Sequence, residues 1–184
     1  MMHNYIALLR GINVGGQKKI KMADLRETLI KTGLNHVETY IQSGNVVFRD
    51  GESNKRVLES RIHKAILDDF GFEVPVLVVL EEDIRKILKN SPFDQNDEDN
   101  KLYYVLLKEP PRTDAVNEFN ELHFEQEDFH ITDACVYLLC KKGYGNAKLS
   151  NNLVEQKLKV EATTRNLRTM QKLLDMVQKK VVSQ

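Results

Sequence analysis

One stretch organises the rest of this chain: Arg10-Gly11-Ile12-Asn13-Val14-Gly15-Gly16-Gln17-Lys18-Lys19. It follows an apolar segment at residues 5–9, which is typical of a buried strand, and it precedes apolar residues at helical spacing between Met22 and Leu29. Three of the nine glycines fall in this stretch, and no acidic residue occurs from Arg10 to Ala23. Glycine takes positive φ angles and lets other groups approach the backbone closely, so we expect this loop to do more than connect two elements.

The residues after this loop predict a hairpin and a second helix. Residues 37–41 and 46–48 favour two strands around the turn Gln42–Asn45. An amphipathic helix follows, for which we expect Ser53 to be the N-cap and Gly71 the end.

A fourth strand completes the pattern. Residues 74–80 favour a strand, and Pro75 places it at an edge of the sheet, because proline cannot donate to a central ladder. The order β-α-β-β-α-β is the ferredoxin-like, or α–β plait, pattern, whose usual strand order is 4-1-3-2. In that order the first and third strands are antiparallel neighbours. We therefore expect Arg10–Lys19 to lie beside Gln42–Asn45, at the same end of the sheet.

The second half of the chain repeats this order. A helix at residues 81–90 and a charged, polar stretch at 94–100 separate the halves, and we expect 94–100 to be a linker. The predicted fold is thus α+β, with ferredoxin-like domains at 1–93 and 101–184, each with an appended C-terminal helix. The elements expected in the second domain are strands at 103–107, 128–132, 135–140 and near Val160, and helices at 113–120, around 149–154 and from an N-cap at Thr164.

The composition is that of an ordinary soluble globular protein. Hydrophobic residues make up 41% and charged residues 29% of the 184 residues, and the formal net charge is zero. The N-terminus lacks the pattern of a secretory signal, and the longest apolar run, Val76–Leu80, is too short to span a bilayer. We therefore expect a cytoplasmic protein without a membrane partner. Both chain ends are basic around an acidic middle, unlike the uniformly basic profile of a dedicated nucleic-acid binder.

The glycine-rich loop is the strongest candidate for a binding site. Backbone N–H groups at the start of a helix bind anions such as phosphate or carboxylate, and basic side chains strengthen the binding. The glycine spacing matches neither the dinucleotide-binding nor the P-loop fingerprint, so the ligand and any cofactor stay unidentified. The alternative is a tight structural turn with solvated lysines. The candidate ligand-binding residues in this loop are Arg10, Gly11, Asn13, Gly15, Gly16 and Lys18.

Two further segments extend this candidate site. Ser43 and Asn45 belong to the turn that we expect at the same end of the sheet as Arg10. Arg165 and Asn166 follow the expected N-cap of the last helix, where the helix dipole favours an anion, and they would have to face the loop across the two domains. The alternatives are a local hairpin turn for the first pair and a capped helix with a surface arginine for the second.

The sequence contains no catalytic or metal-binding motif. Five histidines are scattered without metal-ligand spacing, and no nucleophile motif occurs. Cys135 and Cys140 lie five residues apart in one expected strand, so they should face opposite sides and stay reduced. Whether the protein is an enzyme stays open, as does its oligomeric state, and the small anionic ligand is the expected partner. The alternatives are a nucleic-acid (RNA) binding module and a regulatory or assembly protein without catalysis.

RNA recognition by the sheet is the weaker interpretation. Aromatic residues such as Tyr5 and Phe48 lie on expected strands, and RNA-binding sheets stack bases on aromatic side chains. The basic-Gly-aromatic motif of such sheets is absent from the third strand, which instead reads Asn45-Val46-Val47-Phe48-Arg49. We therefore expect these aromatic residues to pack in the core.

Three segments of the chain, Tyr5–Gly16, Thr39–Phe48 and Thr163–Asn166, carry a recognisable pattern, together with Met22 and Thr169. In these residues the chain resembles an uncharacterised bacterial family, known only as a domain of unknown function (family number 1697). The resemblance covers nearly the whole chain and implies two ferredoxin-like domains. It implies no established activity, substrate or cofactor, so no functional residue is carried over. Where the family often has an aromatic residue after the Arg-Asn pair, this chain has Leu167, which we expect to affect packing only.

Overall fold

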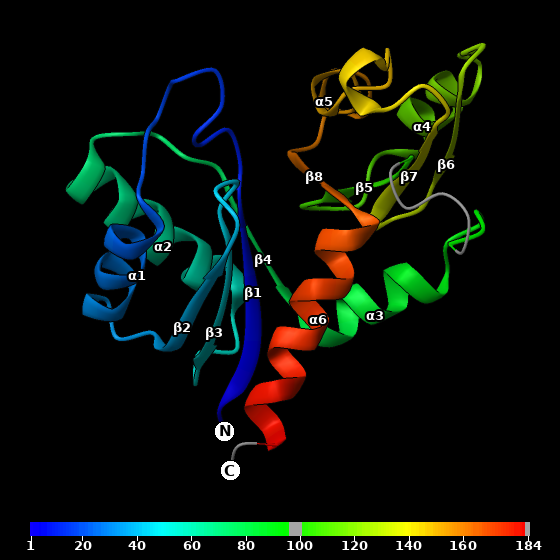
Figure 1. Ribbon diagram of the computed structural model, residues 1–184. Coiled ribbons are helices and arrows are strands. Elements are labelled where there is room, and N and C mark those ends of the chain that lie inside the picture. The colour runs from blue at the N-terminus through cyan, green and yellow to red at the C-terminus, as the bar shows by residue number, and fades with distance from the viewer. Residues whose placement is uncertain (96–100, 183–184) are drawn as a thin grey trace. The chain divides into compact units, whose positions relative to one another are not determined.

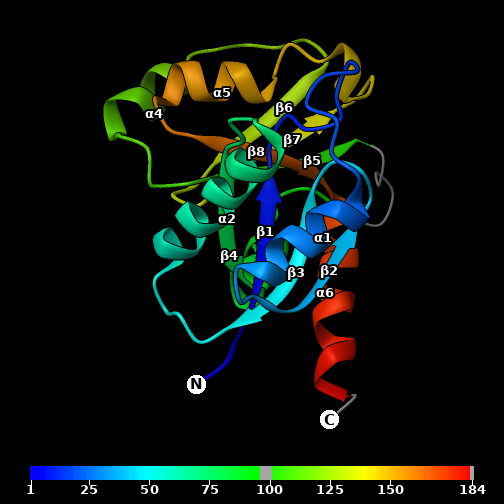
Figure 2. The ribbon, with the colours of Figure 1, turned by 90° about the vertical axis from the view of Figure 1, so that its left-hand side faces the viewer.

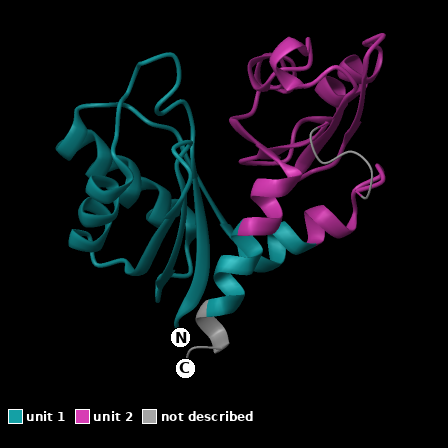
Figure 3. Cartoon of the chain, viewed as in Figure 1, with its two compact units in different colours: residues 1–85, 173–184 teal, residues 86–172 magenta. Residues whose placement is uncertain are grey.

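The computed structural model describes residues 1–95 and 101–182. These residues fold as an α+β protein with two four-stranded antiparallel sheets and six α-helices (Figure 1). The chain divides into unit 1, residues 1–85 and 173–184, and unit 2, residues 86–172 (Figure 3). This division differs from the predicted 1–93 and 101–184, because the last helix is shared and its residues from Leu173 group with unit 1. Of the predicted linker 94–100, residues 96–100 lie outside the described residues.

Unit 1 has the predicted order of strands. Its sheet runs β2-β3-β1-β4, which is the expected 4-1-3-2, and every neighbouring pair is antiparallel. Helices α1 and α2 lie on the same face of this sheet (Figures 1 and 2). Strand β4 lies at the edge beside β1, as predicted, but it begins at Val76, so Pro75 precedes the strand that was predicted to span 74–80. The elements are β1 (His3–Leu9), α1 (Met22–Lys31), β2 (Asn35–Tyr40), β3 (Asn45–Asp50), α2 (Lys55–Phe70) and β4 (Val76–Leu80), followed at once by α3 (Glu81–Lys89).

The central strand β1 is buried on both faces. Tyr5, Ala7 and Leu9 belong to the core that α1 and α2 complete. Ile6 and Leu8 point to the opposite face and are 0% exposed as well. Because both faces of β1 are buried, residues 5–9 form a continuous apolar run and lack the apolar–polar alternation of a half-exposed strand.

The N-cap of α2 differs from the prediction by one residue. Asn54, and not Ser53, precedes the helix, and its side-chain oxygen accepts a hydrogen bond from the backbone N–H of Arg56 at 3.0 Å. Serine and asparagine are both good caps and stand side by side here, so the sequence pattern could not separate them. At the other end Gly71 takes a φ of +73°, as expected of a glycine that ends a helix.

Unit 2 repeats the strand order of unit 1. Its sheet runs β6-β7-β5-β8, again with antiparallel neighbours. Phe119 and Val154, one from each of the two helices α4 and α5, join the core of this sheet. The elements are β5 (Leu102–Leu107), α4 (Thr113–Asn120), β6 (Glu127–Ile131), β7 (Cys135–Cys140), the 3₁₀ turn η1 (Tyr144–Asn146), α5 (Asn151–Leu158), β8 (Ala162–Asn166) and α6 (Leu167–Val182).

The predicted start of the last helix is wrong. Thr163, Thr164 and Arg165 belong to β8, where Arg165 pairs with Tyr104 of β5, and α6 begins only at Leu167. Threonine is β-branched and favours strands, so pairing with β5 outweighs the capping potential of Thr164. The side-chain oxygen of Asn166 accepts a hydrogen bond from the backbone N–H of Thr169 at 2.9 Å, which is the contact that an N-cap makes.

Both cysteines are buried free thiols in β7. Cys140 packs in the core of unit 2, and Cys135 has the opposite strand parity, as predicted. Burial raises the pKa of both thiols, that of Cys140 to about 12. Because the thiolate is the reactive form, we expect a water-soluble disulfide reagent to label neither cysteine in the native protein and both in urea. A labelling time course with and without urea measures this, and rapid labelling of the native protein would contradict it.

Candidate functional site

The Arg10–Lys19 loop and the turn at residues 41–44 lie side by side at one end of the unit 1 sheet. The backbone N–H of Leu9 donates to the carbonyl of Gly44 at 2.8 Å. The side-chain amide of Asn13 donates to the carbonyl of Gln42 at 2.8 Å. The predicted neighbourhood of these two segments is therefore confirmed.

The loop is itself a small hairpin. The backbone N–H of Gln17 donates to the carbonyl of Val14 at 3.0 Å, and that of Asn13 to the carbonyl of Lys18 at 3.2 Å. Between them Gly15 and Gly16 have φ angles of +58° and +77°, as a two-residue type I′ turn requires. A Cβ added at either glycine would meet no atom within 4 Å. The turn geometry, and not a close approach of another group, explains these two glycines.

Asn13 joins the loop to the rest of unit 1. Its φ is +54°, a conformation that asparagine tolerates better than most residues. Its amide nitrogen donates to the carbonyls of Ile20 and Gln42 at 2.9 and 2.8 Å, and its oxygen accepts from the backbone N–H of Ile20 at 2.9 Å. Asn13 therefore acts as a structural link, so its side chain is committed before any ligand arrives.

Lys18 is anchored as well. Its Nζ donates to the carbonyl of Glu73 at 2.5 Å, and its φ is +45°. The contact ties the far side of the hairpin to the segment that enters β4. Lys18 thus adds positive charge to this end of the sheet while it fixes the position of the loop.

Ser43 and Asn45 shape the neighbouring turn. Asn45 is fully buried, and its side-chain nitrogen donates to the carbonyl of Tyr40 and to Oγ of Ser43, both at 3.0 Å. Between them Gly44 has a φ of +81°, and a Cβ there would lie 2.7 Å from both Leu9 Cβ and Ile12 Cδ1. Gly44 is therefore the glycine at which the turn presses against the strand and the loop.

The groups of the loop that remain to meet a ligand are backbone N–H groups and exposed lysines. Among the described residues, none accepts a hydrogen bond from the backbone N–H of Gly11, Gly15 or Gly16. Lys19 and Lys21 are exposed, whereas Arg10 is half-buried and uses its backbone N–H to bind the carbonyl of Pro75 at 3.0 Å. Lys19 and Lys21 were not among the ligand-binding residues predicted from the sequence, although their positive charge is evident there.

Arg165 and Asn166 lie in unit 2 and are strand residues. Arg165 is 8% exposed, and burial lowers the pKa of its guanidinium to about 10. Its Nη1 donates to the carbonyl of Thr164 at 2.8 Å. The predicted role of these residues at a helix N-terminus is corrected for Arg165, which lies in the β8 ladder. Their participation in one site with Arg10 stays a prediction.

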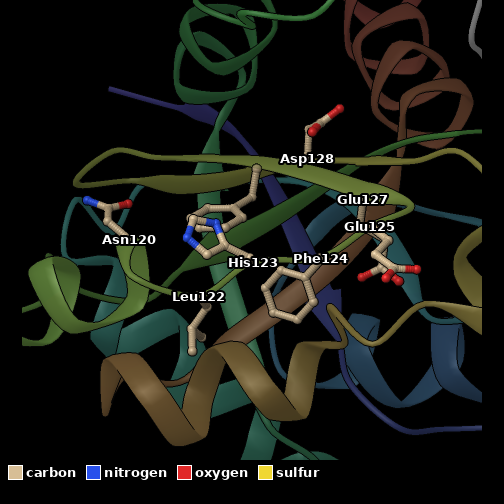
Figure 4. Close-up of a pocket in the computed structure, with 8 residues that line it drawn as sticks. Asn120, Leu122, His123, Phe124, Glu125, Glu127 and Asp128 are labelled. Carbon is tan, nitrogen blue, oxygen red and sulfur yellow. The ribbon is translucent and has the colours of Figure 1, made fainter.

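Unit 2 also has an open cavity of about 620 Å³ at the loop between α4 and β6. Two of its acidic residues are already engaged: Glu127 accepts from the backbone N–H groups of Lys148 and Leu149 at 2.8 and 2.7 Å, and Asp128 pairs with Lys141 at 2.9 Å. Figure 4 shows Asp128 pointing away from the other labelled side chains. The polar groups do not converge, so this cavity is not the candidate site. It is lined by Asn120, Leu122, His123, Phe124, Glu125, Glu127, Asp128 and Phe129.

Neither a metal site nor a membrane-spanning helix is found in the described part of the chain. No group of three or more histidine, cysteine or acidic side chains is arranged there to hold a metal ion. A search of the same residues found no helix with both the length and the apolar character needed to cross a membrane.

Comparisons with known proteins agree with the resemblance seen in the sequence. A family model described as "Protein of unknown function (DUF1697)" matches residues 2–137. The solved structure of conserved bacterial protein SP0830 from Streptococcus pneumoniae is similar, with 26% identity and a TM-score of 0.72 over 96% of this chain and 99% of that one. Among curated proteins, none matches the chain.

Proposed function

Since this chain belongs to the DUF1697 family of proteins of unknown function, its activity has to be argued from its own residues, and we propose that it binds a small anionic ligand at the Arg10–Lys19 loop. The ligand is phosphorylated or nucleotide-like. The observation that carries the proposal is the combination of a local excess of positive charge with backbone N–H groups at Gly11, Gly15 and Gly16 that donate to no acceptor among the described residues.

The proposed site divides into groups that bind and groups that position. Arg10, Lys18 and Lys19 supply charge, and the glycine N–H groups donate hydrogen bonds to the anion. Asn13, Ser43 and Asn45 hold the loop and the turn in place through the contacts given above. Fixed donors bind an anion more tightly than mobile ones, because less conformational entropy is lost. Arg165 and Asn166 belong to the proposal as further contacts. The proposal also includes a ferredoxin-like fold for each unit and a cytoplasmic location.

Calorimetric titration of the full chain with inorganic phosphate, nucleotides and sugar phosphates tests this function. We expect one of these anions to bind, and Lys19→Ala to weaken the binding about fivefold to tenfold through loss of one charged contact. Arg10→Ala should weaken it at least as much. Lys31→Ala, at an exposed position in the last turn of α1, removes the same charge away from the loop and is the matched control.

Two results of this titration would contradict the proposal. If none of these anions binds the folded protein, or if Lys31→Ala weakens binding as much as Lys19→Ala, the loop is a structural turn with solvated lysines.

A further inference from the structure

A second basic, glycine-rich segment follows the third strand of unit 2. It reads Lys141-Lys142-Gly143-Tyr144-Gly145-Asn146-Ala147-Lys148, and no acidic residue occurs between Asp133 and Glu155. We propose that this segment binds single-stranded nucleic acid, with a base stacked on Tyr144 and phosphates held by Lys142 and Lys148. The site lies in unit 2 and is independent of the anion site proposed for unit 1.

Tyr144 is one half of a stacked aromatic pair. Its ring lies against that of Tyr103 from β5, with centroids 4.5 Å apart and planes 22° from parallel. Both residues are only half-buried, unlike Tyr5 and Phe48, which are at most 2% exposed. A partly exposed aromatic ring with basic neighbours is the usual platform on which proteins stack an unpaired base.

Hydrogen bonds hold the Tyr144 ring in one orientation. Its hydroxyl accepts from the backbone N–H of Asn151 at 2.9 Å and donates to Oγ1 of Thr164 at 3.3 Å. The Thr164 hydroxyl in turn donates to the side-chain oxygen of Asn151 at 2.8 Å. These contacts connect η1, the start of α5 and β8, so the platform is rigid before a base arrives. A rigid platform lowers the entropy cost of stacking.

The lysines of this segment divide into one that is paired and two that are not. Lys141 forms an ion pair with Asp128 at 2.9 Å. Lys142 and Lys148 are exposed, and no carboxylate in the described ranges pairs with either side chain. An exposed lysine without an acidic partner can release a counterion from a phosphate when nucleic acid binds. The two free ammonium groups are thus the electrostatic part of the site.

The sequence of the segment supports the same ligand. Lys142-Gly143-Tyr144-Gly145 has the basic-Gly-aromatic-Gly order that RNA-binding sheets carry on their third strand. Here the motif stands just after the third strand of unit 2 and not on the strand itself, and η1 begins at its tyrosine, Tyr144. The aromatic residue is therefore presented by a turn, from which it stacks on Tyr103 of β5 and packs against the core of unit 2.

Fluorescence anisotropy with a labelled oligo(U) RNA of about 12 nucleotides tests the proposal on the full chain. Replacing Lys142 and Lys148 together by alanine should weaken binding and lower the slope of log K against log salt by about 1.4, since each phosphate contact contributes about 0.7. The matched control replaces Lys86 and Lys89, two exposed lysines of α3 in the same unit, and should leave the slope unchanged.

Tyr144 variants test the stacking. Tyr144→Leu should weaken binding roughly tenfold or more, whereas Tyr144→Phe keeps the ring and should retain most of the affinity. The chain has six tyrosines and no tryptophan, so the part of the tyrosine-fluorescence quenching by the RNA that is lost in Tyr144→Leu reports stacking on Tyr144. Circular dichroism of each variant shows whether it is folded. Should Tyr144→Leu fold poorly, the lysine pair, whose side chains form no hydrogen bond or ion pair with the described residues, carries the test alone.

Three outcomes would overturn the proposal: no binding at about 50 mM salt, equal losses in the two lysine pairs, or unchanged affinity in a folded Tyr144→Leu variant. The corresponding DNA oligonucleotide shows whether the sugar matters. Arg10→Ala and Lys19→Ala should leave RNA binding intact, so the failure of this proposal and the failure of the proposed anion site are distinguishable.

Discussion

Replacing Gly44 by alanine is expected to lower the free energy of unfolding by about 3 kcal/mol or more. Two costs add at this position. The φ of +81° disfavours any residue with a Cβ, by about 1–2 kcal/mol. The new Cβ would also lie 2.7 Å from Leu9 Cβ and from Ile12 Cδ1, so the turn must shift away from the strand. Both neighbours are buried, and neither can move without disturbing the core.

Gly71→Ala is the matched control for this prediction. Gly71 has a similar φ of +73°, but a Cβ there would meet no atom within 4 Å. Alanine at this position carries the conformational cost alone, about 1–2 kcal/mol. Urea denaturation of both variants, followed by tyrosine fluorescence, measures the difference. Equal midpoints for the two variants would mean that the contact of Gly44 with Leu9 and Ile12 contributes nothing.

Asn13→Ala is expected to destabilise unit 1 by about 2–3 kcal/mol. The substitution removes three hydrogen bonds and leaves the carbonyls of Ile20 and Gln42 and the N–H of Ile20 without their partner. It also places alanine at a φ of +54°, which asparagine tolerates better. Hydrogen exchange should speed up in the loop and in the neighbouring turn together, because one side chain holds both.

Asn13→Asp separates the two kinds of contact. The carboxylate still accepts a hydrogen bond from the N–H of Ile20 but can no longer donate to the two carbonyls. We expect a loss of stability at least as large as with alanine, because a carboxylate oxygen would replace the amide nitrogen that lies 2.9 and 2.8 Å from the carbonyl oxygens of Ile20 and Gln42, and would repel both. If Asn13→Asp unfolded at a higher urea concentration than Asn13→Ala, the hydrogen bond from the N–H of Ile20 would matter more than the two hydrogen bonds to the carbonyls.

Much of the fold could be predicted because hydrophobic periodicity and turn chemistry agree along most of the chain. The edge position of β4 followed from Pro75, and the proximity of the loop to the turn at 41–44 followed from strand order alone. The start of α6 was misplaced because Thr164 is compatible with both a cap and a strand. Only pairing with β5, a contact distant in sequence, decides between them.

The candidate site was predicted less well, because residue type does not reveal what a side chain is already bonded to. Asn13 and Asn45 are polar and stand in loop sequences, which suggests ligand contacts, yet both are held by carbonyls of unit 1. For the loop glycines the sequence predicted both positive φ angles and the close approach of a ligand. The positive φ angles of Gly15 and Gly16 belong to a hairpin turn, and their contact with an anion stays a prediction. The stacking of Tyr144 on Tyr103 depends on residues about forty positions apart, so no local pattern could indicate it.

The division of unit 1 into two pieces of chain affects how the protein is made. Residues 1–85 leave the ribosome first, but the segment from Leu173 that belongs with them is translated only after the whole of unit 2, residues 86–172. Strand β1, the central strand of the first sheet, must likewise wait for β4 before its second edge is paired. Unit 2 is contiguous and can fold as it emerges. The part of the protein that is synthesised first is therefore completed last.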